Sequence, residues 1–400
     1  MTSTPRTVVM VGPFGMRPRT TMRVRALPLA KALARRGYHI TMLLPPWQNP
    51  EDSGRSWIDE DVRIENMALP KGWPGWFHYS LAARIARRAR ELAPDVIHAF
   101  KPKAYAGLVH FMLRRRFPVV VDTDDWEGPG GWNALAEYPA WMKRFFAWQE
   151  RWGLKNADAV TVASRALETL TWPMGGTPDR VFYLPNGIQS QMPRTRSLNS
   201  GRPTLLLYTR FFEYELERLW RIIQLVRDQR PEVRLLVVGQ GFAGEEDELL
   251  GLARRAGWRA FHSPSDVPEA DLLYAGWGTE DTLSWGFEAA DIAIYPFDDT
   301  LLNRTKCPMK LMDLLSAGIP VVADRVGQIG EVIVHGKTGF LVECGDDRAF
   351  ARSILKLLED SDLRRRMGAA AAADVAHRFD WDVLAETAVA AYDYAAARFI

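Results

Sequence analysis

The chain has 400 residues, enough for two or three domains, and its 47% hydrophobic and 25% charged residues are typical of an ordinary globular protein. Two cysteines, Cys307 and Cys344, exclude a disulfide framework, and no apolar run is long enough to cross a bilayer. The net charge of +2 is uneven, because residues 1–190 hold 26 Lys/Arg against 17 Asp/Glu, whereas residues 191–400 hold 25 against 32. The basic first half indicates either an anionic partner or a solvated arginine-rich surface.

The chain opens with a predicted strand–helix–strand unit. A strand is expected at 7–11, a helix at 24–36 and a second strand at 40–44. In the first connecting loop, Gly15 would let the backbone approach a ligand, and Arg17 would meet negative charge there. A tight turn with solvated arginines fits the same spacing equally well.

Short apolar runs continue to alternate with helical segments through the first half, after a polar loop predicted at 51–61. We expect strands at 95–100, 119–122, 159–163 and 181–184, and helices at 81–92, 140–156 and 165–170. This alternation is typical of an α/β domain whose parallel sheet is covered by helices on both faces.

A polar segment without apolar periodicity, residues 189–203, then precedes a second α/β pattern. Strands are expected at 204–209, 234–239, 271–275, 292–296 and 319–323, and the chain ends in an Ala-rich helix. The predicted organisation is an N-terminal domain over 1–188, a linker over 189–203, a second domain over 204–380, and a helix over 381–400 that would pack back on the N-terminal domain.

Residues 304–331, RTKCPMKLMDLLSAGIPVVADRVGQIGE, are predicted to form a loop, a helix, a buried strand and a second loop. The helix start favours an anion, and Lys306 and Lys310 add positive charge beside it. Asp313 lies on the same helical face as Lys310. Together these residues would hold a diphosphate and a sugar hydroxyl; alternatively, Lys310 and Asp313 form an ordinary surface pair.

The acidic run DTDD, residues 122–125, follows a predicted strand and has three interpretations. Asp124 or Asp125 would hydrogen-bond an acceptor hydroxyl. Alternatively, the run binds a divalent metal ion, or its carboxylates fix the turn before Gly128.

Four further residues would complete an acceptor site with Arg17. Trp126 and Trp132 suit the apolar faces of a sugar, next to Asn133, although core packing explains tryptophans here equally well. Lys101 follows the preceding strand, and the carboxyl ends of parallel strands meet at one sheet edge, where ligands bind.

Five segments carry a family resemblance. They are RWGLKNADAVTVASRALE at 151–168, YLPNGI at 183–188, VVGQG at 237–241, YAGW at 274–277 and PMKLMDLLSAGIPVVADRVGQIGEVIVHGKTGFLV at 308–342. Together they resemble the GT-B glycosyltransferases, in particular the retaining enzymes of glycosyltransferase family 4. The resemblance covers almost the whole chain and implies two facing Rossmann-like, doubly wound parallel-sheet domains.

The resemblance implies that the second domain holds a nucleotide-sugar donor and the first holds the acceptor. Arg210 matches a family arginine that contacts the diphosphate. The family lysine beside it falls near Glu215, so Lys306 or Lys310 would supply the missing charge.

The family also has a Glu-x7-Glu pair. Asp313 matches the second Glu, which holds donor ribose hydroxyls, and Thr305 replaces the first, which contacts the transferred sugar. The resemblance adds loop amides from 326–329 to the same pocket. The expected donor-binding residues are Gly15, Arg210, Gly241, Lys306, Lys310, Asp313, Gly327, Gln328, Ile329 and Glu331.

The implied reaction is transfer of a sugar from a nucleotide-diphosphate donor to an acceptor hydroxyl, with retention and without a metal ion or other cofactor. Asp124, Asp125, Arg210 and Lys310 would be the catalytic residues. An idle nucleotide-sugar-binding subunit and a GT-B-like sugar-nucleotide epimerase are the alternatives. The acceptor would be a sugar, a glycolipid or a small molecule, and a nucleic-acid partner is not expected.

The chain start lacks a signal-peptide pattern, which predicts a cytoplasmic protein. Aromatic and basic residues mix at 73–90 and 141–155, beside the arginines at 114–116. This mixture indicates either peripheral contact with anionic lipid at the inner face of the membrane, or packing with solvated arginines.

Overall fold

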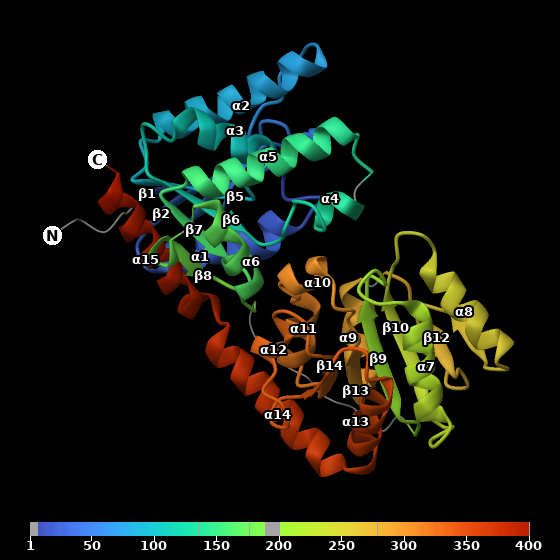
Figure 1. The fold of residues 1–400 in the computed structure, drawn as a ribbon. Helices are drawn as coiled ribbons and strands as arrows, with labels where there is room; N and C mark the ends of the chain where they lie inside the picture. The colour runs from blue at the N-terminus through green and yellow to red at the C-terminus, as the bar shows by residue number, and fades with distance from the viewer. Residues whose placement is uncertain (1–6, 136, 176, 189–200, 278, 400) are drawn as a thin grey trace. The chain divides into compact units, whose positions relative to one another are not determined.

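A computed structural model describes residues 7–135, 137–175, 177–188, 201–277 and 279–399, which form two compact α/β units (Figure 1). Unit 1 consists of Met1–Gln189, Thr305–Cys307 and Phe379–Ile400, and unit 2 of Ser190–Arg304 and Pro308–Arg378. Most of the predicted linker, residues 189–200, lies outside the described residues.

The described part of unit 1 contains an eight-stranded sheet in the order β3-β4-β2-β1-β5-β6-β7-β8, parallel throughout except for the edge pair β3–β4. Its strands are β1 (Thr7–Val11), β2 (His39–Leu44), β3 (Ser56–Asp59), β4 (Val62–Asn66), β5 (Val96–Phe100), β6 (Val119–Thr123), β7 (Ala159–Val162) and β8 (Val181–Tyr183). The sequence pattern missed β3 within the predicted polar loop, because the strand buries no side chain that would mark it as apolar.

Successive residues of β1 pack on opposite faces of this sheet, as the two-residue repeat of a strand requires. Val8 and Met10 pack in the core beneath α1 and α15, whereas Val9 and Val11 pack beneath α2 and α3. The helices of unit 1 are α1 (Leu27–Arg35, after a π-helical turn at Met22–Ala26), α2 (Pro74–Glu91), α3 (Ala104–Leu113), α4 (Trp132–Leu135), α5 (Ala140–Asn156), α6 (Arg165–Thr171) and α15 (Trp381–Arg398).

The described part of unit 2 contains a seven-stranded, fully parallel sheet in the order β11-β12-β10-β9-β13-β14-β15. The strands are β9 (Thr204–Thr209), β10 (Arg234–Gly239), β11 (Ala260–His262), β12 (Leu272–Tyr274), β13 (Ile292–Tyr295), β14 (Val321–Asp324) and β15 (Phe340–Val342). The helices are α7 (Leu216–Arg227), α8 (Glu245–Arg255), α9 (Glu280–Ala289), α10 (Leu301–Thr305), α11 (Met309–Ser316), α12 (Ile329–Val332), α13 (Asp347–Glu359) and α14 (Ser361–Arg378).

The two C-terminal helices belong to different units. Helix α14 ends unit 2, and α15 packs in the core of unit 1, where Trp381 and Tyr392 are buried. The backbone N–H of Ile188 donates to the Phe379 carbonyl at 2.8 Å, which fixes the start of α15. Two doubly wound α/β units and a C-terminal helix confirm the predicted fold class. Among the described residues, no helix combines the length and apolarity that crossing a membrane would require.

Candidate functional site

In unit 1, the ammonium group of Lys101 lies between two carboxylates of the loop that follows β6. Lys101 Nζ is 2.7 Å from Asp124 Oδ1 and 2.7 Å from Asp125 Oδ2. Lys101 has φ +55°, a left-handed conformation that non-glycine residues rarely adopt. Such strain persists where the surroundings fix the residue, and it is concentrated at functional sites.

A second charged layer lies beside this group. Lys103 Nζ is 2.6 Å from Glu127 Oε2, and the Glu127 backbone N–H donates to Glu150 Oε1 on α5 at 2.9 Å. Burial raises the pKa of Glu150 to about 8, so this carboxyl group is mostly protonated at pH 7. The acidic run is therefore held in place by buried partners from the segment after β5 and from α5, and is not a solvated loop.

The pKa values of the two central carboxyl groups shift in opposite directions. In Asp124, burial raises the pKa, but the charges of Lys101 and Arg25 outweigh burial and lower it. In Asp125, burial outweighs Lys101, and the neighbouring Asp124 charge adds to it, so the pKa is raised. The Asp125 side chain is 20% exposed and that of Asp124 is 10% exposed, so Asp125 is the more accessible of the two to an acceptor hydroxyl.

The metal interpretation of this run gains no support, because Lys101 supplies the positive charge between the carboxylates. The described ranges contain no group of three or more His, Cys, Asp or Glu residues that could hold a metal ion.

Asp122, the first carboxylate of the run, is a structural residue. It is fully buried and accepts hydrogen bonds from Arg25 Nε at 2.8 Å and Nη2 at 2.6 Å. Arg25 also donates to Asn186 Oδ1 at 2.9 Å, and Thr161 Oγ1 donates to Asp122 at 2.7 Å. This network joins the ends of β6, β7 and β8 beneath the loop. It could not be predicted from the sequence, because nothing in the sequence distinguishes Arg25 from an ordinary helix residue.

The predicted sugar-binding wall requires a correction at Trp126. Trp126 is 5% exposed, packs in the core of unit 1 and donates its indole N–H to the Pro129 carbonyl at 3.0 Å. Because its ring packs against core side chains and its N–H is already paired, Trp126 serves the core and not a sugar-binding wall. Trp132 is half-buried. Burial raises the pKa of Asp125, and a hydrogen bond with Trp132 partly opposes this shift.

Asn133 carries the clearest sign of a binding position in this loop. It is 5% exposed, and neither its amide oxygen nor its amide nitrogen has a hydrogen-bond partner among the described residues. Leaving a buried polar group unpaired costs about 1–3 kcal/mol. A polar ligand that binds this amide would recover that free energy.

The first loop of unit 1 has a simpler explanation than ligand binding. Arg17 forms ion pairs of 3.1 Å with both Glu51 and Asp52, and its side chain is exposed. A Cβ atom on Gly15 would lie 2.7 Å from Asn49 Oδ1, so a larger residue there would have to displace the buried Asn49 side chain. Arg17 is engaged by acidic residues of the following loop.

In unit 2, two cations converge on the indole ring of Trp277. Arg210 Cζ lies 4.9 Å and Lys310 Nζ 5.9 Å from this ring. Arg210 also stacks on Phe242 at 4.5 Å, and Lys310 on Tyr208 at 5.0 Å. Sequence reasoning identified both cations but not the rings; the available signal was the YAGW segment, which contains Trp277.

The loop after β10 contains Gly241, one of the expected donor-binding residues. The Gly241 backbone N–H donates to Glu246 Oε2 at 3.0 Å, and a Cβ there would lie 2.1 Å from Glu245 Oε2. A carboxylate of this chain therefore occupies the backbone amide of this residue. Arg210 Nε donates to the neighbouring Gln240 carbonyl at 3.1 Å, which joins the loops after β9 and β10.

Asp313 is half-buried on α11, one turn beyond Lys310. Burial raises its pKa to about 6, and the Lys310 charge partly opposes this shift. A carboxyl group in this environment is stabilised when a ligand donates hydrogen bonds to its charged form.

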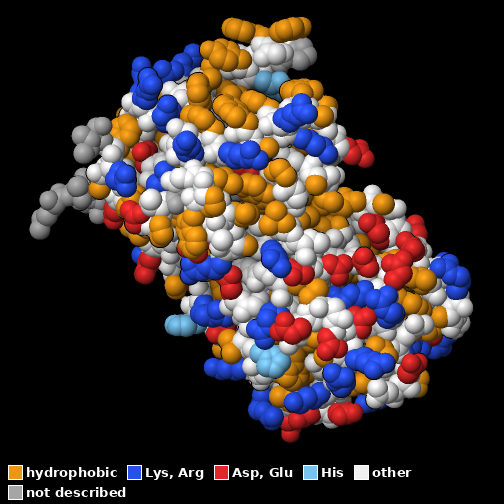
Figure 2. Space-filling model, viewed as in Figure 1, with side chains coloured by type: hydrophobic (Ala, Val, Ile, Leu, Met, Phe, Trp, Pro, Cys, Tyr) orange, Lys and Arg blue, Asp and Glu red, His pale blue; other side chains and the backbone are white. Residues whose placement is uncertain are grey.

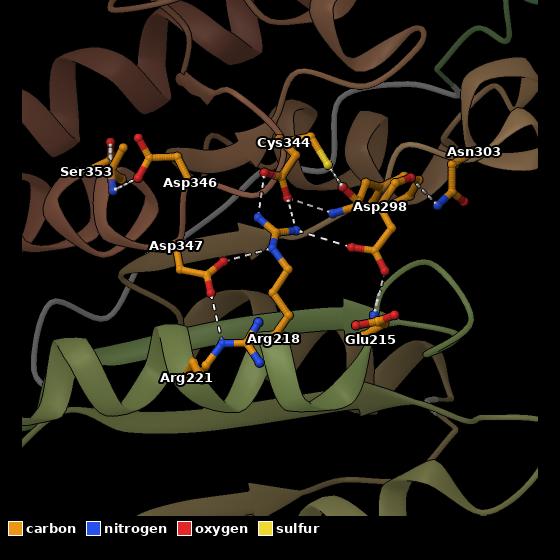
Figure 3. Close-up of polar contacts among 12 residues, drawn as sticks. Glu215, Arg218, Arg221, Asp298, Asn303, Cys344, Asp346, Asp347 and Ser353 are labelled. Carbon is orange, nitrogen blue, oxygen red and sulfur yellow. Dashed lines mark hydrogen bonds and ion pairs between the residues drawn. The ribbon is translucent and has the colours of Figure 1, made fainter.

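Arg218, on α7, does not replace the missing family lysine. Its guanidinium lies between three carboxylates, at 2.8 Å (Asp324), 2.9 Å (Asp347) and 3.5 Å (Asp298), and Figure 3 shows those of Asp347 and Asp298. Asp298 also accepts the Glu215 backbone N–H at 2.7 Å. This network fixes the loop before α10 and the end of β14.

The segment Thr305–Cys307 packs with unit 1. Ser164 Oγ donates to the Thr305 carbonyl at 2.8 Å, and the Asn186 N–H donates to Cys307 Sγ at 3.2 Å. Thr305 is fully buried, so the position of the family's first Glu here holds a small packed side chain. Lys306 belongs to the same segment, whereas Lys310 belongs to unit 2.

In the loop after β14, Gly327 is required by close packing, because its φ is +49° and a Cβ would lie 2.4 Å from the Arg304 carbonyl oxygen. The Ile329 N–H, expected to bind the donor, already donates to the Val326 carbonyl at 3.2 Å. Gln328 is buried and Glu331 is half-buried.

Two family models match this chain in succession: "Glycosyl transferase 4-like domain" at residues 20–187 and "Glycosyl transferases group 1" at residues 202–360. A sulfoquinovosyl transferase of Arabidopsis thaliana is 26% identical over 76% of this chain and 57% of its own length. A phosphatidyl-myo-inositol mannosyltransferase of Mycobacterium leprae is 23% identical over 96% of both chains. The chain thus spans less than two thirds of the plant relative.

Solved structures share the fold of the chain. Sucrose-phosphate synthase from Thermosynechococcus elongatus superposes with a TM-score of 0.72 at 18% identity, over 95% of this chain and 96% of that one. Anabaena HepE in complex with UDP-glucose superposes with a TM-score of 0.65 at 18% identity, over 95% and 97%. Each half of the chain therefore matches a glycosyltransferase family model, and the chain is a GT-B glycosyltransferase that resembles family 4.

Proposed function

We propose that the chain transfers a sugar from a nucleotide-diphosphate sugar to an acceptor hydroxyl, with retention and without a metal ion. Unit 2 would hold the donor. The observation that carries this proposal is the convergence of Arg210 and Lys310 on Trp277, with Asp313 one turn along α11. Two cations stabilise the charge that develops on a leaving diphosphate, and that charge is largest in the transition state.

The donor would be a nucleotide sugar, since a HepE structure contains UDP-glucose on the same fold. Diphosphate binding would displace Glu246 from the Gly241 amide and draw Arg210 away from Gln240. The half-buried Asp313 would accept hydrogen bonds from ribose hydroxyls.

Unit 1 would hold the acceptor, which we propose is a sugar, a glycolipid or a small polyol. Asn133 would bind one hydroxyl through its unpaired amide, and Asp125 would accept a hydrogen bond from the attacking hydroxyl. Lys101 would keep Asp124 charged and Asp125 in position.

A thermal-shift screen of UDP, GDP, ADP, TDP and CDP, alone and as sugars, tests donor binding. Arg210→Ala should weaken the best ligand at least about tenfold, because a charge-assisted hydrogen bond contributes about 1.5–3 kcal/mol. The matched control is Arg255→Ala on the exposed side of α8, which should leave affinity unchanged.

Release of nucleoside diphosphate in the presence of EDTA tests transfer without a metal ion, and NMR of the product's anomeric centre tests retention. Binding without release across donor and acceptor panels would favour the idle subunit. A changed donor sugar without any acceptor would favour the epimerase.

A further inference from the structure

Helix α5 carries a row of aromatic side chains on its outer side. Trp141, Phe145 and Trp148 are 66%, 37% and 51% exposed. Their spacing of four and three residues places them on one helical face with Trp152. The rings of Phe145 and Trp148 stack at 5.9 Å, and those of Trp148 and Trp152 at 6.2 Å. We call these four side chains the aromatic ridge. Together they form an apolar strip along one face of the helix.

A basic flank, Arg144, Arg151 and Lys155, follows the aromatic ridge along the helix. At about 100° per residue, these three positions fall within an arc of roughly 40° beside the ridge. All three are exposed, whereas Glu150, the acidic residue of α5, is fully buried. The outer surface of α5 is therefore apolar on one side and positive on the other.

Neighbouring helices extend this surface. Phe111 of α3 is 56% exposed and lies 5.2 Å from the Trp152 ring. At the start of α2, Trp73, Trp76 and Tyr79 are between 57% and 77% exposed. Figure 2 shows hydrophobic side chains gathered over α2 and α5, with Lys and Arg side chains among them.

We propose that the aromatic ridge, its basic flank and the start of α2 dock the protein on an anionic lipid bilayer. Tryptophan and tyrosine rings are amphipathic and prefer the level of the lipid headgroups. Basic residues beside them are attracted to anionic headgroups, and a helix with one apolar and one basic side lies in the plane of the interface. A polyanion such as RNA fits less well, because its bases would need separate exposed rings to stack on. The rings of the ridge instead stack on one another.

Docking has a consequence for the acceptor site. Helix α5 begins seven residues after Asn133 in the chain. Docking through α5 would hold the loop of Asn133 near the lipid surface, where this loop would meet a lipid-linked acceptor. This consequence rests on the proposed function, whereas docking itself does not.

The test is co-sedimentation of the full chain with phosphatidylcholine vesicles, with and without phosphatidylglycerol, at low and high ionic strength and without donor. We expect binding only to the anionic vesicles, weakened by salt because salt screens surface charge. The double variant Trp141→Ser, Trp148→Ser and the triple variant Arg144→Glu, Arg151→Glu, Lys155→Glu should each lose about tenfold in partitioning.

Two controls match these variants. Trp172→Ser removes an exposed tryptophan elsewhere in unit 1, and Arg255→Glu, Arg348→Glu, Arg352→Glu makes the same charge change on unit 2. Both should bind vesicles as the unmodified chain does. Intact nucleoside diphosphate affinity and an unchanged thermal transition show that each variant is folded.

Several outcomes would overturn the proposal. These are no binding to anionic vesicles at low salt, ridge-variant binding equal to that of the unmodified chain, or RNA binding that vesicles do not compete. A ridge variant that converts a dimer to a monomer in light scattering, with vesicle binding intact, would instead identify the surface as an interface between two copies.

Discussion

Arg25 and Asp122 form an ion pair in which both side chains are at most 1% exposed. Removing one partner of such a pair leaves an uncompensated buried charge, which typically costs 3–5 kcal/mol. Arg25→Met keeps much of the side-chain volume and isolates Asp122. We expect it to lower the free energy of unfolding of unit 1 by about 3 kcal/mol in urea titrations.

The control for this prediction is Arg35→Met. Its partner Asp382 lies 2.8 Å away, but both side chains are about half exposed, so the loss should stay below about 1 kcal/mol. Equal losses in the two variants would contradict a special contribution from burial.

Asp313 gives a pH-dependent prediction. Burial raises its pKa from 3.8 to about 6 in the folded chain. The folded state therefore holds this proton more tightly than the unfolded state, and stability falls as the pH rises from about 4 to 6. Asp313→Asn removes the ionisation and should stabilise unit 2 by about 1–2 kcal/mol at pH 8 and by nothing at pH 3.5. Thermal unfolding at the two pH values measures the difference.

The matched change is Asp281→Asn, on α9, whose exposed side chain should alter stability little at either pH. If Asp313 binds ribose hydroxyls, Asp313→Asn will also weaken nucleoside diphosphate binding while it stabilises the fold. A variant stabilised equally at both pH values would contradict the ionisation argument.

The two cations of unit 2 could be predicted from their places in the chain. Arg210 follows a recognisable strand, and Lys310 lies at the start of a recognisable helix. Their shared ring, Trp277, could not be predicted, because cation–π contacts join loops far apart in the sequence. The same holds for Lys101, whose two carboxylate partners come from another strand end. Strand ends show which residues share a sheet edge, but not which of them neutralise one another.

At the scale of elements, the loop between β6 and α4 depends on one glycine. A Cβ on Gly131 would lie 2.0 Å from the Trp126 carbonyl oxygen, too close for any side-chain movement to relieve. Gly131→Ala should therefore displace this loop and destabilise unit 1 by about 2–3 kcal/mol, while the nucleoside diphosphate affinity of unit 2 stays the same. Calorimetric titration and thermal unfolding measure the two effects.

The control is Gly251→Ala, in the middle of α8, which should not lower stability. A Cβ there would approach only the end of the flexible Arg255 side chain, and alanine favours helix by about 0.5–1 kcal/mol. A loss of stability in this control, or none in Gly131→Ala, would contradict the steric argument.

The bounds of helices and strands were predicted well where buried residues follow a clear periodic pattern. They were predicted poorly where the residues of an element are exposed. The buried strands β5 and β6 lie within about one residue of their predicted bounds. Helix α2 was expected at 81–92 but begins at Pro74, because proline is compatible with a helix start. Its first two turns expose aromatic residues, so they lack the apolar face that marks an amphipathic helix.

At the scale of the whole molecule, α15 completes the core of unit 1 although it follows unit 2 in the chain. Ala388 is fully buried in that core, so Ala388→Asp would bury an unpaired charge. We expect scanning calorimetry to show a lowered transition for unit 1 and an unchanged one for unit 2. A nucleoside diphosphate at about 100 times its Kd should stabilise only the second transition, by about 2.7 kcal/mol.

Val383→Asp makes the same change at a position of α15 that is 47% exposed, and should leave both transitions in place. A single transition shifted equally by both variants would show that the two units unfold together.

The packing of Thr305–Cys307 with unit 1 means that the polypeptide passes between the units four times: near residue 189, at 304–305, at 307–308 and at 378–379. A graft of unit 2 alone would therefore need four compatible junctions, two of which are separated by only three residues. Ser164, Asn186 and the helix after residue 380 would have to accept the graft, so specificity is better transplanted by exchanging individual loops.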